Sequence, residues 1–384
     1  MKMNYANEAF TLSRRQLIKS GICAGCLLLN PALANVFAAD NKIQSRPARF
    51  FTKMENKVVQ CNLCFRECIL ADGETGRCNV RTNKEGVLHT LVYGNPGAVN
   101  IDPIEKKPFF HVLPGSMAFS IATVGCNINC KFCQNWQIAH AKPGSIDTRK
   151  LLPEDLIKEV SNSHCPVLAF TYSEPTVWSE YVIDSATEAK KNNIASVVVS
   201  NGSWHPKALS AVIDSVSAIK VDLKSIRESY YRDICDAELK PVLNNIISIR
   251  KAGMWLELVN LMVTSLNDSE NDVKDLVKWV KDNVGDDVPL HFTRFHPMYL
   301  LKNLSPTPVQ RLDKAYEIAK AEGLKYVYVG NVPNHPSQNT VCPNCGATII
   351  ERKGYYILKN LIEDGKCSKC KHTIPGRWDV KEIF

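Results

Sequence analysis

The chain has 384 residues, of which 45% are hydrophobic and 22% charged, a balance typical of a globular protein with an ample core. This length exceeds one average domain but fits a single α/β barrel with appendages. The formal net charge of +8 is modest for the length. This charge does not indicate nucleic-acid binding, because solubility or a basic catalytic face for an anionic substrate explains it equally well.

The cysteines are numerous and grouped. Of the fifteen, only Cys165 and Cys235 stand alone, and both are interpreted as buried small apolar residues. Thiols spaced as C-x2-C favour metal binding over disulfides. The four groups are Cys23/Cys26, Cys61/Cys64/Cys68/Cys78, Cys126/Cys130/Cys133 and Cys342/Cys345/Cys367/Cys370.

The first 40 residues resemble a twin-arginine export signal. Residues 13–19 carry paired arginines, Arg14 and Arg15, and an apolar stretch follows at 22–29 before small residues that can be cleaved. The apolar stretch is too short for a standard membrane span, so no transmembrane segment is expected. The leader predicts export to the periplasm. If it is not used, or is vestigial, the protein stays in the cytoplasm.

A small cysteine-bearing module is predicted over residues 56–114. It contains a strand-like run at 87–93 and turn signals at Asp72-Gly73 and Asn95-Pro96. Cys61, Cys64, Cys68 and Cys78 fall within eighteen residues. Four thiolates at this density fit structural zinc or a second cubane cluster for electron relay. Zinc is the favoured interpretation.

Three cysteines follow the next apolar strand, at 118–124. Cys126, Cys130 and Cys133 form a C-x3-C-x2-C run. A cubane iron–sulfur cluster normally takes four thiolates, one per iron, so a loop that offers three leaves one iron open to another ligand. A zinc site would pair its cysteines two and two. The loop should lie at the carboxyl end of a strand, where α/β folds place active sites.

Strand and helix patterns then alternate to about residue 335. Apolar residues at 273, 276, 277 and 280 have helical spacing, and an acidic first turn with proline predicts a helix starting near 153. Six β/α units imply a parallel sheet with right-handed crossovers. We therefore predict an α/β fold, a partial (β/α)6 TIM-like barrel over 115–335, which a helix at 308–322 and a strand at 326–328 extend. The strand-like runs are 118–124, 167–171, 194–200, 218–223, 255–263 and 290–293.

Polar residues at the strand ends are the candidate cofactor contacts. Glu174 follows the second strand, and Asn201 follows the third in Ser200-Asn201-Gly202. Each has a structural alternative. Glu174 can be a first-turn carboxylate at a helix N-terminus, and Asn201 can belong to an ordinary Asn-Gly turn.

The later strands add candidates for the reaction chamber. Lys220, Asp222 and Lys224 alternate along the fourth strand and would share a face. Asp222 is a candidate cofactor contact, and Asp222, Lys224 and Arg294 are candidate catalytic residues. His291 and His296 lie beside Arg294 but are more typical of satisfied structural histidines.

The tail, residues 338–384, carries two C-x2-C pairs about twenty residues apart: Cys342/Cys345 and Cys367/Cys370. This spacing predicts a tetrahedral four-thiolate site, that is, a zinc-ribbon-like module. A rubredoxin-like iron site or an auxiliary cluster is the alternative, since soft thiolates accept both metals.

The three-cysteine loop, with Phe132 before its last cysteine, resembles the signature of the radical S-adenosylmethionine (SAM) superfamily. Together with the four-cysteine tail, further motifs narrow the resemblance to the radical SAM component of the AmmeMemoRadiSam system, a relative of pyruvate formate-lyase activating enzymes, over residues 56–384. These motifs are Cys61-Asn-Leu-Cys64-Phe-Arg-Glu-Cys68, Asp102-Pro-Ile-Glu-Lys-Lys-Pro108, Cys133-Gln-Asn-Trp136, Thr171-Tyr-Ser-Glu-Pro-Thr176, Val221-Asp-Leu-Lys-Ser225 and Thr293-Arg-Phe-His-Pro297.

The resemblance implies a 4Fe–4S cluster on the three-cysteine loop whose open iron binds the amino and carboxylate groups of SAM. Reduction of the cluster would cleave the S–C5′ bond, giving methionine and a 5′-deoxyadenosyl radical that abstracts hydrogen. Glu174 and Pro175 match a Gly-Gly-Glu-Pro-like motif whose acid meets the methionine ammonium. Tyr172 and Ser173 replace its two glycines. The implied partners are a low-potential donor of flavodoxin or ferredoxin type and proteins of the Memo and AMMECR types.

The leading hypothesis is therefore a radical SAM enzyme that abstracts hydrogen from an unidentified substrate. One alternative is an activase acting on a partner glycyl-radical enzyme. A second is a non-catalytic iron–sulfur or zinc protein that transfers electrons or senses redox state. The export leader favours the second alternative, because SAM and low-potential electrons are supplied in the cytoplasm.

Overall fold

The computed structural model describes residues 45–380. The predicted leader, residues 1–40, lies outside them. No helix of the described residues is long and apolar enough to cross a bilayer.

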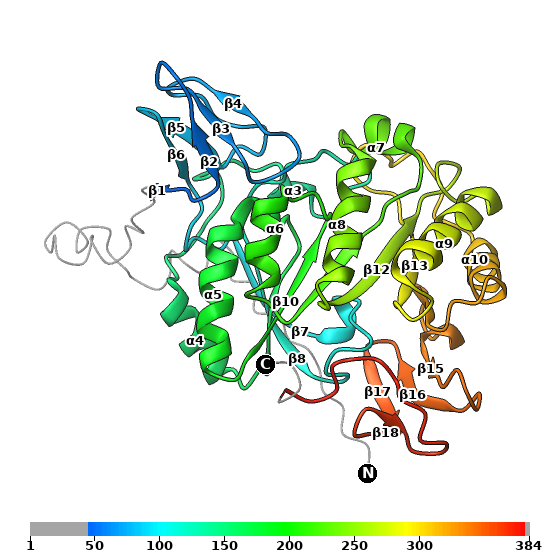
Figure 1. The fold of residues 1–384 in the computed structure, drawn as a ribbon. Helices are drawn as coiled ribbons and strands as arrows, with labels where there is room; N and C mark the ends of the chain where they lie inside the picture. The colour runs from blue at the N-terminus through cyan, green and yellow to red at the C-terminus, as the bar shows by residue number, and fades with distance from the viewer. Residues whose placement is uncertain (1–44, 381–384) are drawn as a thin grey trace, which may run out of the picture. The chain divides into compact units, whose positions relative to one another are not determined.

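A mixed sheet of eight strands forms the centre of the fold (Figure 1). Its order is β14-β13-β12-β11-β10-β9-β8-β7, so β14 and β7 are the edges and the sheet is open. Strands β8 to β14 run parallel, and β7 pairs with β8 antiparallel. The strands are β7 (Ala98–Pro103), β8 (Met117–Ala122), β9 (Val167–Phe170), β10 (Ala195–Ser200), β11 (Ala218–Asp222), β12 (Trp255–Met262), β13 (Leu290–Arg294) and β14 (Val327–Gly330).

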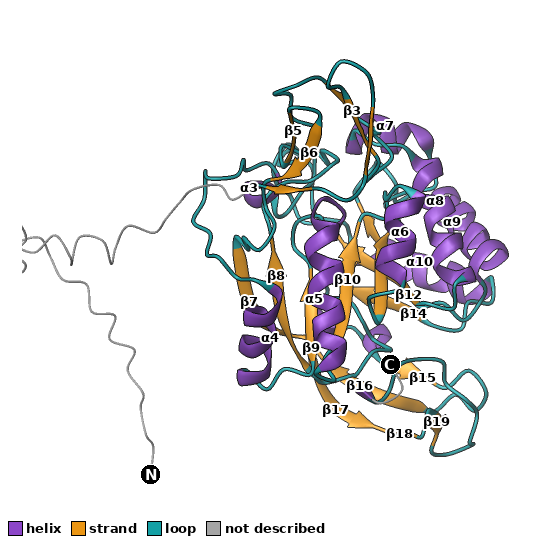
Figure 2. Ribbon diagram, turned by 60° about the vertical axis from the view of Figure 1, so that its left-hand side comes forward, coloured by secondary structure: helices purple, strands orange, loops and turns teal. Residues whose placement is uncertain are grey.

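Helices cover the outer face of this sheet (Figure 2). Alternate strand residues point to opposite faces, and outward side chains such as Ile121, Phe170 and Val198 join the main hydrophobic core. Alpha helices and short 3-10 helices (η) connect the strands. They are η2 (Ile104–Lys106), α3 (Trp136–Ala139), α4 (Pro153–Asn162), η3 (Pro175–Trp178), α5 (Ser179–Lys191), α6 (Pro206–Ile213), α7 (Glu228–Cys235), α8 (Leu239–Lys251), α9 (Glu270–Val284) and α10 (Val309–Ala321).

The inner face of the sheet changes character from one edge to the other. Small side chains such as Ala118, Ala169 and Ala195 form a second core on the first strands. Charged and polar side chains replace them farther along, where Lys220 and His291 are buried. The later strands can therefore contact a polar ligand on the inner face, while the apolar cluster on the first strands stays buried.

A module of short antiparallel strands precedes β7 and carries Cys61, Cys64, Cys68 and Cys78. Two three-stranded sheets, β1-β6-β5 and β2-β3-β4, build it. In Figure 1 this blue module lies at the opposite end of the barrel from the C-terminal strands. Its strands are β1 (Arg46–Pro47), β2 (Phe51–Lys53), β3 (Val59–Cys61), β4 (Ile69–Leu70), β5 (Arg81–Lys84) and β6 (Val87–Thr90).

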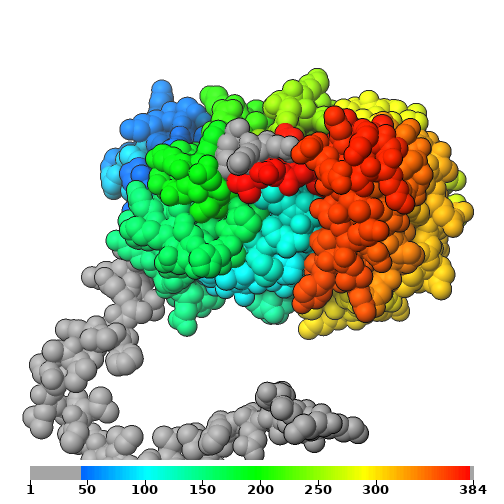
Figure 3. All heavy atoms as spheres, turned by 90° about the horizontal axis from the view of Figure 1, so that it is seen from below, coloured from blue at the N-terminus to red at the C-terminus, as the bar shows by residue number. Residues whose placement is uncertain are grey.

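The C-terminal ribbon covers the amino ends of the barrel strands. Figure 3, seen from below, shows its orange and red surface spread over that end. Arg352 anchors it, since its guanidinium donates to the carbonyl of Phe110 at 2.8 Å and lies 4.1 Å from the Phe110 ring centroid. Its elements are η4 (Pro336–Gln338), β15 (Thr340–Val341), β16 (Thr348–Lys353), β17 (Tyr356–Asn360), β18 (Ile362–Glu363) and β19 (Lys366–Cys367).

The sequence predicts this architecture well from residue 115 onward. The predicted α/β sheet of parallel strands is confirmed, and the run at 326–328 extends it as part of β14. Strand β7, whose residues were grouped with the N-terminal module, instead pairs with β8 along six residues. Only Asp102 of this strand is buried, because β7 is an edge strand.

Candidate functional site

The three-cysteine loop follows the carboxyl end of β8, as predicted. Cys130 is buried, and Cys126 and Cys133 are partly buried. The loop is fixed by backbone bonds, with the amides of Asn129 and Lys131 donating to the carbonyls of Cys235 and Ile234 at the end of α7. These two bonds fix the backbone between Cys126 and Cys133 against the end of α7.

Gly125 brings this loop against the N-terminal module. Its φ is +95°, and a Cβ built on it would meet Val80 Cγ1 at 2.7 Å and the Cys78 carbonyl oxygen at 2.8 Å. Any larger residue would be strained in both backbone and packing. Glycine at this position therefore allows the two cysteine groups to lie side by side.

Asn201 joins the end of β10 to the loop. Its side-chain nitrogen donates to Asn127 Oδ1 at 2.9 Å and lies 3.9 Å from Cys126 Sγ. An N–H directed at a thiolate stabilises the negative charge of a bound cluster. The structure thus places Asn201 beside Cys126, where it organises the loop.

Glu174 lies between the ends of β9 and β10, nearly inaccessible to solvent. Its Oε1 accepts from Thr176 N at 2.9 Å and Ser200 Oγ at 2.6 Å, and its Oε2 accepts from Asn201 N at 2.8 Å. Burial raises the pKa of the carboxyl, although these donors oppose the rise. An ionised carboxylate offers about four acceptor sites, so one remains for an ammonium group. The structural alternative also holds, because Glu174 is the N-cap of η3.

Asp222 ends β11 between two lysines. Lys220 Nζ bonds its Oδ1, and Lys224 Nζ lies 3.3 Å from its Oδ2, so all three share the inner face. Burial raises the pKa of Asp222, but attraction to the lysines outweighs it and lowers the pKa overall. The Asp222 side chain remains 33% exposed. It is therefore a charged, accessible group at the carboxyl end of the sheet.

Lys224 connects this triad to the cysteine loop. Its Nζ lies 5.6 Å from the Phe132 ring centroid. Burial lowers the pKa of Lys224, but the opposing charges of Asp222 and Cys130 raise it well above the usual range. The Lys224 charge favours the thiolate forms of Cys130 and Cys133, and so reduces the electrostatic cost of burying them.

The predicted residues near β13 separate into different environments. Arg294 donates from Nε to the carbonyl of Thr307 at 2.8 Å and is partly buried. His291 is buried and bonds Glu257 Oε2 at 2.8 Å, a satisfied structural histidine as expected. His296 is exposed. Arg294 remains a candidate for the rim of the chamber.

Tyr172 was not selected by the sequence analysis as a site residue. Its φ is +67°, which is rare for a bulky side chain, and it takes the place of a glycine in the motif. Its hydroxyl bonds Asp102, and Lys107 Nζ lies 2.9 Å from the same hydroxyl. Asp102 and Lys107 belong to a quoted motif, so the contact could have been sought there. Strained residues of this kind concentrate at functional sites.

Cys235 was also missed. Sequence spacing indicates an isolated apolar cysteine, and it is fully buried. Its thiol nevertheless interacts with Cys130, and this hydrogen bond is the largest influence lowering the pKa of Cys130. Only the fold of α7 against the loop brings the two together, so no local pattern could reveal it.

The C-terminal cysteines converge on one point. Among the described residues, Cys342, Cys345, Cys367 and Cys370 form a group whose ligand atoms all lie within 4.8 Å of one another. Two sulfur pairs are 3.6 Å and 3.9 Å apart. A tetrahedral ion with metal–sulfur bonds of about 2.3 Å separates its sulfurs by about 3.8 Å. The donor set therefore fits a single zinc or iron ion.

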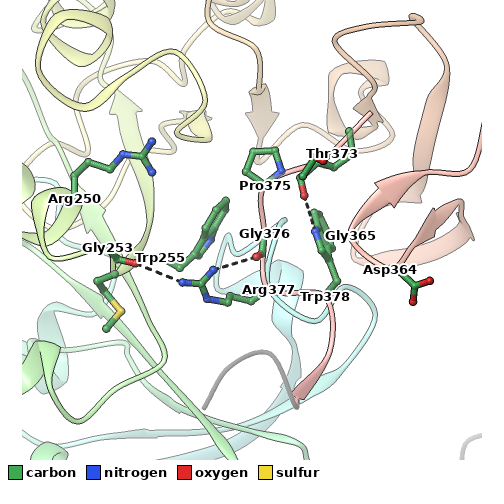
Figure 4. Close-up of a pocket in the computed structure, with 12 residues that line it drawn as sticks. Arg250, Gly253, Trp255, Asp364, Gly365, Thr373, Pro375, Gly376, Arg377 and Trp378 are labelled. Carbon is green, nitrogen blue, oxygen red and sulfur yellow. Dashed lines mark hydrogen bonds between the residues drawn. The ribbon is translucent and has the colours of Figure 1, made fainter. Parts of the chain in front are cut away.

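A cavity of about 360 Å³ lies between the ribbon and the barrel (Figure 4). Trp255 at the start of β12 faces Arg377 and Trp378 of the tail across it. This is the amino end of the strands, opposite the cysteine loop, and such barrels place their chemistry at the carboxyl end. The cavity is therefore separate from the candidate site.

Comparison with known proteins places the chain in a family. Residues 120–280 match the model of the radical SAM superfamily. An uncharacterised protein of Methanocaldococcus jannaschii is 40% identical over 331 residues, covering 86% of this chain and 98% of that protein. A second protein of that organism, named "Putative glycyl-radical enzyme activating enzyme", is 24% identical over 178 residues, covering 44% of this chain and 70% of that protein.

Solved structures with a similar fold include a domain of a pyruvate-formate lyase-activating enzyme from Bacteroides vulgatus. It is 16% identical, with a TM-score of 0.39, covering 42% of this chain and 98% of that one. A radical SAM methyltransferase from Sphaerobacter thermophilus is 10% identical, with a TM-score of 0.46 and coverage of 83% and 86%. On its sequence matches and its three-cysteine loop, the chain belongs to the radical SAM superfamily.

Proposed function

We propose that this protein is an enzyme that cleaves SAM reductively and abstracts hydrogen from a substrate bound on the inner face of the sheet. The observation that carries the proposal is the buried loop of Cys126, Cys130 and Cys133 at the carboxyl end of β8. Three thiols of this loop are the donor set that a cubane with one open iron requires.

The cluster chemistry that we propose is that of radical SAM enzymes. Cys126, Cys130 and Cys133 would hold a 4Fe–4S cluster, which would supply an open iron for SAM and the electron for reductive cleavage of its S–C5′ bond, yielding methionine and the radical that takes a hydrogen atom. The protein's part is to bind, orient and exclude water.

The residues of this chain supply those functions from three strand ends. Glu174 offers its remaining acceptor site to the methionine ammonium, and the backbone N–H of Asn201 holds the carboxylate in place by donating to its Oε2. Asp222 presents a carboxylate that Lys220 and Lys224 keep ionised, suited to hydroxyl or ammonium groups. Arg294 provides a cation for the rim of the chamber, where an anionic substrate group would bind.

Anaerobic reconstitution with iron and sulfide, followed by dithionite and SAM, tests this function. The account predicts 5′-deoxyadenosine and methionine in equal amounts, with none above background in Cys130→Ser. The Cys165→Ser variant is the matched control, because Cys165 is buried but stands apart from every cysteine group. Equal yields in wild type and Cys130→Ser would contradict the proposal.

The second candidate is an activase that abstracts hydrogen from a glycine of a partner enzyme. The similarity to the M. jannaschii protein named "Putative glycyl-radical enzyme activating enzyme" favours this activase function. A stable protein-based radical signal, formed only when a partner enzyme is present together with SAM, would distinguish it from action on a small molecule. Assembly with proteins of the Memo and AMMECR types stays a prediction from the resemblance, as does export through the twin-arginine leader.

A further inference from the structure

The N-terminal cysteines differ from the C-terminal four in their arrangement. Cys61, Cys64 and Cys78 are buried, and Cys68 is partly exposed. In the part of the chain that the structure describes, their sulfurs do not form a group within 4.8 Å, whereas the C-terminal sulfurs do. A single ion requires sulfurs about 3.8 Å apart. A cubane places each thiolate on its own iron, and so spaces them more widely.

A buried arginine beside these cysteines has donors with no acceptor. The Arg81 side chain is 1% exposed, and its Nη1 donates to Glu180 Oε2 at 2.9 Å. Its Nε and Nη2 have no hydrogen-bond partner among the described residues. After Glu180, Cys61 and Cys78 are the groups whose charge acts on Arg81.

Unsatisfied buried N–H groups on a charged side chain are costly. Thiolates or cluster sulfides near Cys61 and Cys78 would accept from them and would balance the guanidinium charge. Four neutral thiols would do neither. Arg81 therefore points to an anionic sulfur-containing group at this position.

The module also lies directly against the SAM-site loop. The Cys78 carbonyl oxygen and Val80 contact Gly125, the residue before Cys126. On the other side, Arg66 Nε donates to the carbonyl of Asn127, and Phe65 N donates to the carbonyl of Ser203 at 3.1 Å. One segment of the module is thus hydrogen-bonded to the loop that holds the SAM-site cysteines and to its neighbour, and a second segment packs against the start of that loop.

Side chains complete a continuous path between the two cysteine groups. Asn127 Nδ2 donates to Ser203 Oγ at 2.7 Å, and the carbonyl of Ser203 accepts from Phe65, the residue after Cys64. Asn127 Oδ1 accepts from the Asn201 side chain, whose nitrogen lies 3.9 Å from Cys126 Sγ. Cys61, Cys78 and Cys130 are all buried side chains of the main hydrophobic core. Cys68, at the partly exposed side, is the point nearest to solvent among the four.

We propose that Cys61, Cys64, Cys68 and Cys78 hold a second iron–sulfur cluster that passes single electrons from an external donor to the SAM-site cluster. Four protein thiolates leave it no open iron, so it transfers electrons and does not bind substrate. A low-potential flavodoxin or ferredoxin loses one electron, which enters near Cys68 and leaves through the Cys64 and Cys78 side. The sequence favours zinc here, but the sulfur spacing and Arg81 favour a cluster.

Metal content distinguishes zinc from an iron–sulfur cluster at the N-terminal cysteines without an activity measurement. Iron, sulfide and zinc are measured per folded chain in wild type and in Cys126→Ala/Cys130→Ala/Cys133→Ala, which lacks the SAM-site ligands. The variant is expected to retain about four irons, since each cubane takes four, together with a reducible signal in electron paramagnetic resonance (EPR). Loss of all cluster iron, with two zincs bound instead, would overturn the proposal.

Arg81→Gln in the same triple-variant background tests the contact to the cluster. Removing a positive charge and N–H donors disfavours the reduced state, so the midpoint potential of the remaining cluster should become more negative. The exposed-site control is Arg77→Gln, since Arg77 pairs with Asp236 at 2.8 Å. An unchanged potential in Arg81→Gln would remove Arg81 from the site.

The relay step rests on the proposed function, and its test is kept separate. Cys61→Ala/Cys64→Ala should lose 5′-deoxyadenosine formation with reduced flavodoxin as the donor but retain it with dithionite, a small reductant that can reach the SAM site directly. Equal activity with both donors would contradict the relay while leaving the metal assignment intact. No activity with either donor in wild type would instead contradict the proposed function.

Discussion

At the scale of single residues, Glu174 has a structural role and a proposed role in SAM binding, and any substitution affects both. Its carboxylate holds the ends of β9 and β10 together through Ser200, Thr176 and Asn201, and we propose that its remaining acceptor site binds the SAM ammonium. Sequence analysis offered these as alternatives. Both can hold, because one carboxylate has enough acceptor sites for both.

Glu174→Gln is predicted to weaken SAM binding roughly 10- to 100-fold, the effect of losing a hydrogen bond to a charged group. Cluster iron should be retained. Isothermal titration with SAM gives the affinity, and Ser200→Ala is the control, because it removes one structural bond but keeps the charge. If Ser200→Ala weakens binding as much as Glu174→Gln, the carboxylate only positions the loop.

His111 gives the native state a pH dependence that can be measured. It is fully buried, with Nδ1 2.7 Å from the Pro375 carbonyl and Nε2 2.6 Å from the Tyr328 hydroxyl. Burial lowers its pKa to about 4, with smaller effects from Arg352 and His291 in the same direction and from Glu257 against it. Because the folded pKa lies below the ordinary value of 6.5, the unfolded chain takes up the proton first as the pH falls.

Stability should therefore be complete above pH 6.5 and fall between 6.5 and about 4. At pH 5, protonation of this histidine in the unfolded chain lowers the free energy of unfolding by about 2 kcal/mol relative to neutral pH. The His111→Asn variant should show a smaller difference in thermal unfolding between pH 7.5 and pH 5 than wild type, while exposed His296→Asn should match wild type. Parallel pH profiles for wild type and His111→Asn would contradict this assignment.

At the scale of elements, the close approach of the module to the β8 loop depends on Gly125. Alanine would cost about 1–2 kcal/mol for the left-handed backbone alone, and its Cβ would also clash with the Cys78 carbonyl. Gly125→Ala is predicted to reduce cluster iron per chain. Gly253→Ala has a similar positive φ but open space around its Cβ, so it should lose some stability and keep its iron. Equal iron in both variants would show that the contact is not required.

Elements with regular periodicity could be predicted from sequence, and contacts between elements could not. The pattern at 273, 276, 277 and 280 gave α9, and apolar runs gave β8 to β13. The pairing of β7 with β8 was missed, because an exposed edge strand lacks a clean alternation. The Cys130–Cys235 and Tyr172–Asp102 contacts join residues far apart in sequence. No local pattern encodes such pairs.

At the scale of the whole molecule, the eight-stranded sheet separates the cysteine groups at its two ends. The module and the three-cysteine loop meet at the carboxyl ends of the strands, and the ribbon covers the amino ends. Cys342→Ser/Cys345→Ser should therefore lose one metal ion and unfold at lower temperature, yet keep its cluster iron and its SAM cleavage. Metal analysis and calorimetry check this. Loss of cluster iron in this variant would show that the two ends are coupled.

The central claim is that SAM binds to a cluster on Cys126, Cys130 and Cys133, and EPR of the reduced protein tests it most directly. The measurement uses Cys61→Ala/Cys64→Ala, so that only the SAM-site cluster contributes, with and without SAM. The account predicts that SAM changes the spectrum of the reduced cluster, and that Glu174→Gln in this background needs more SAM to produce the change. An identical spectrum with and without saturating SAM would contradict it.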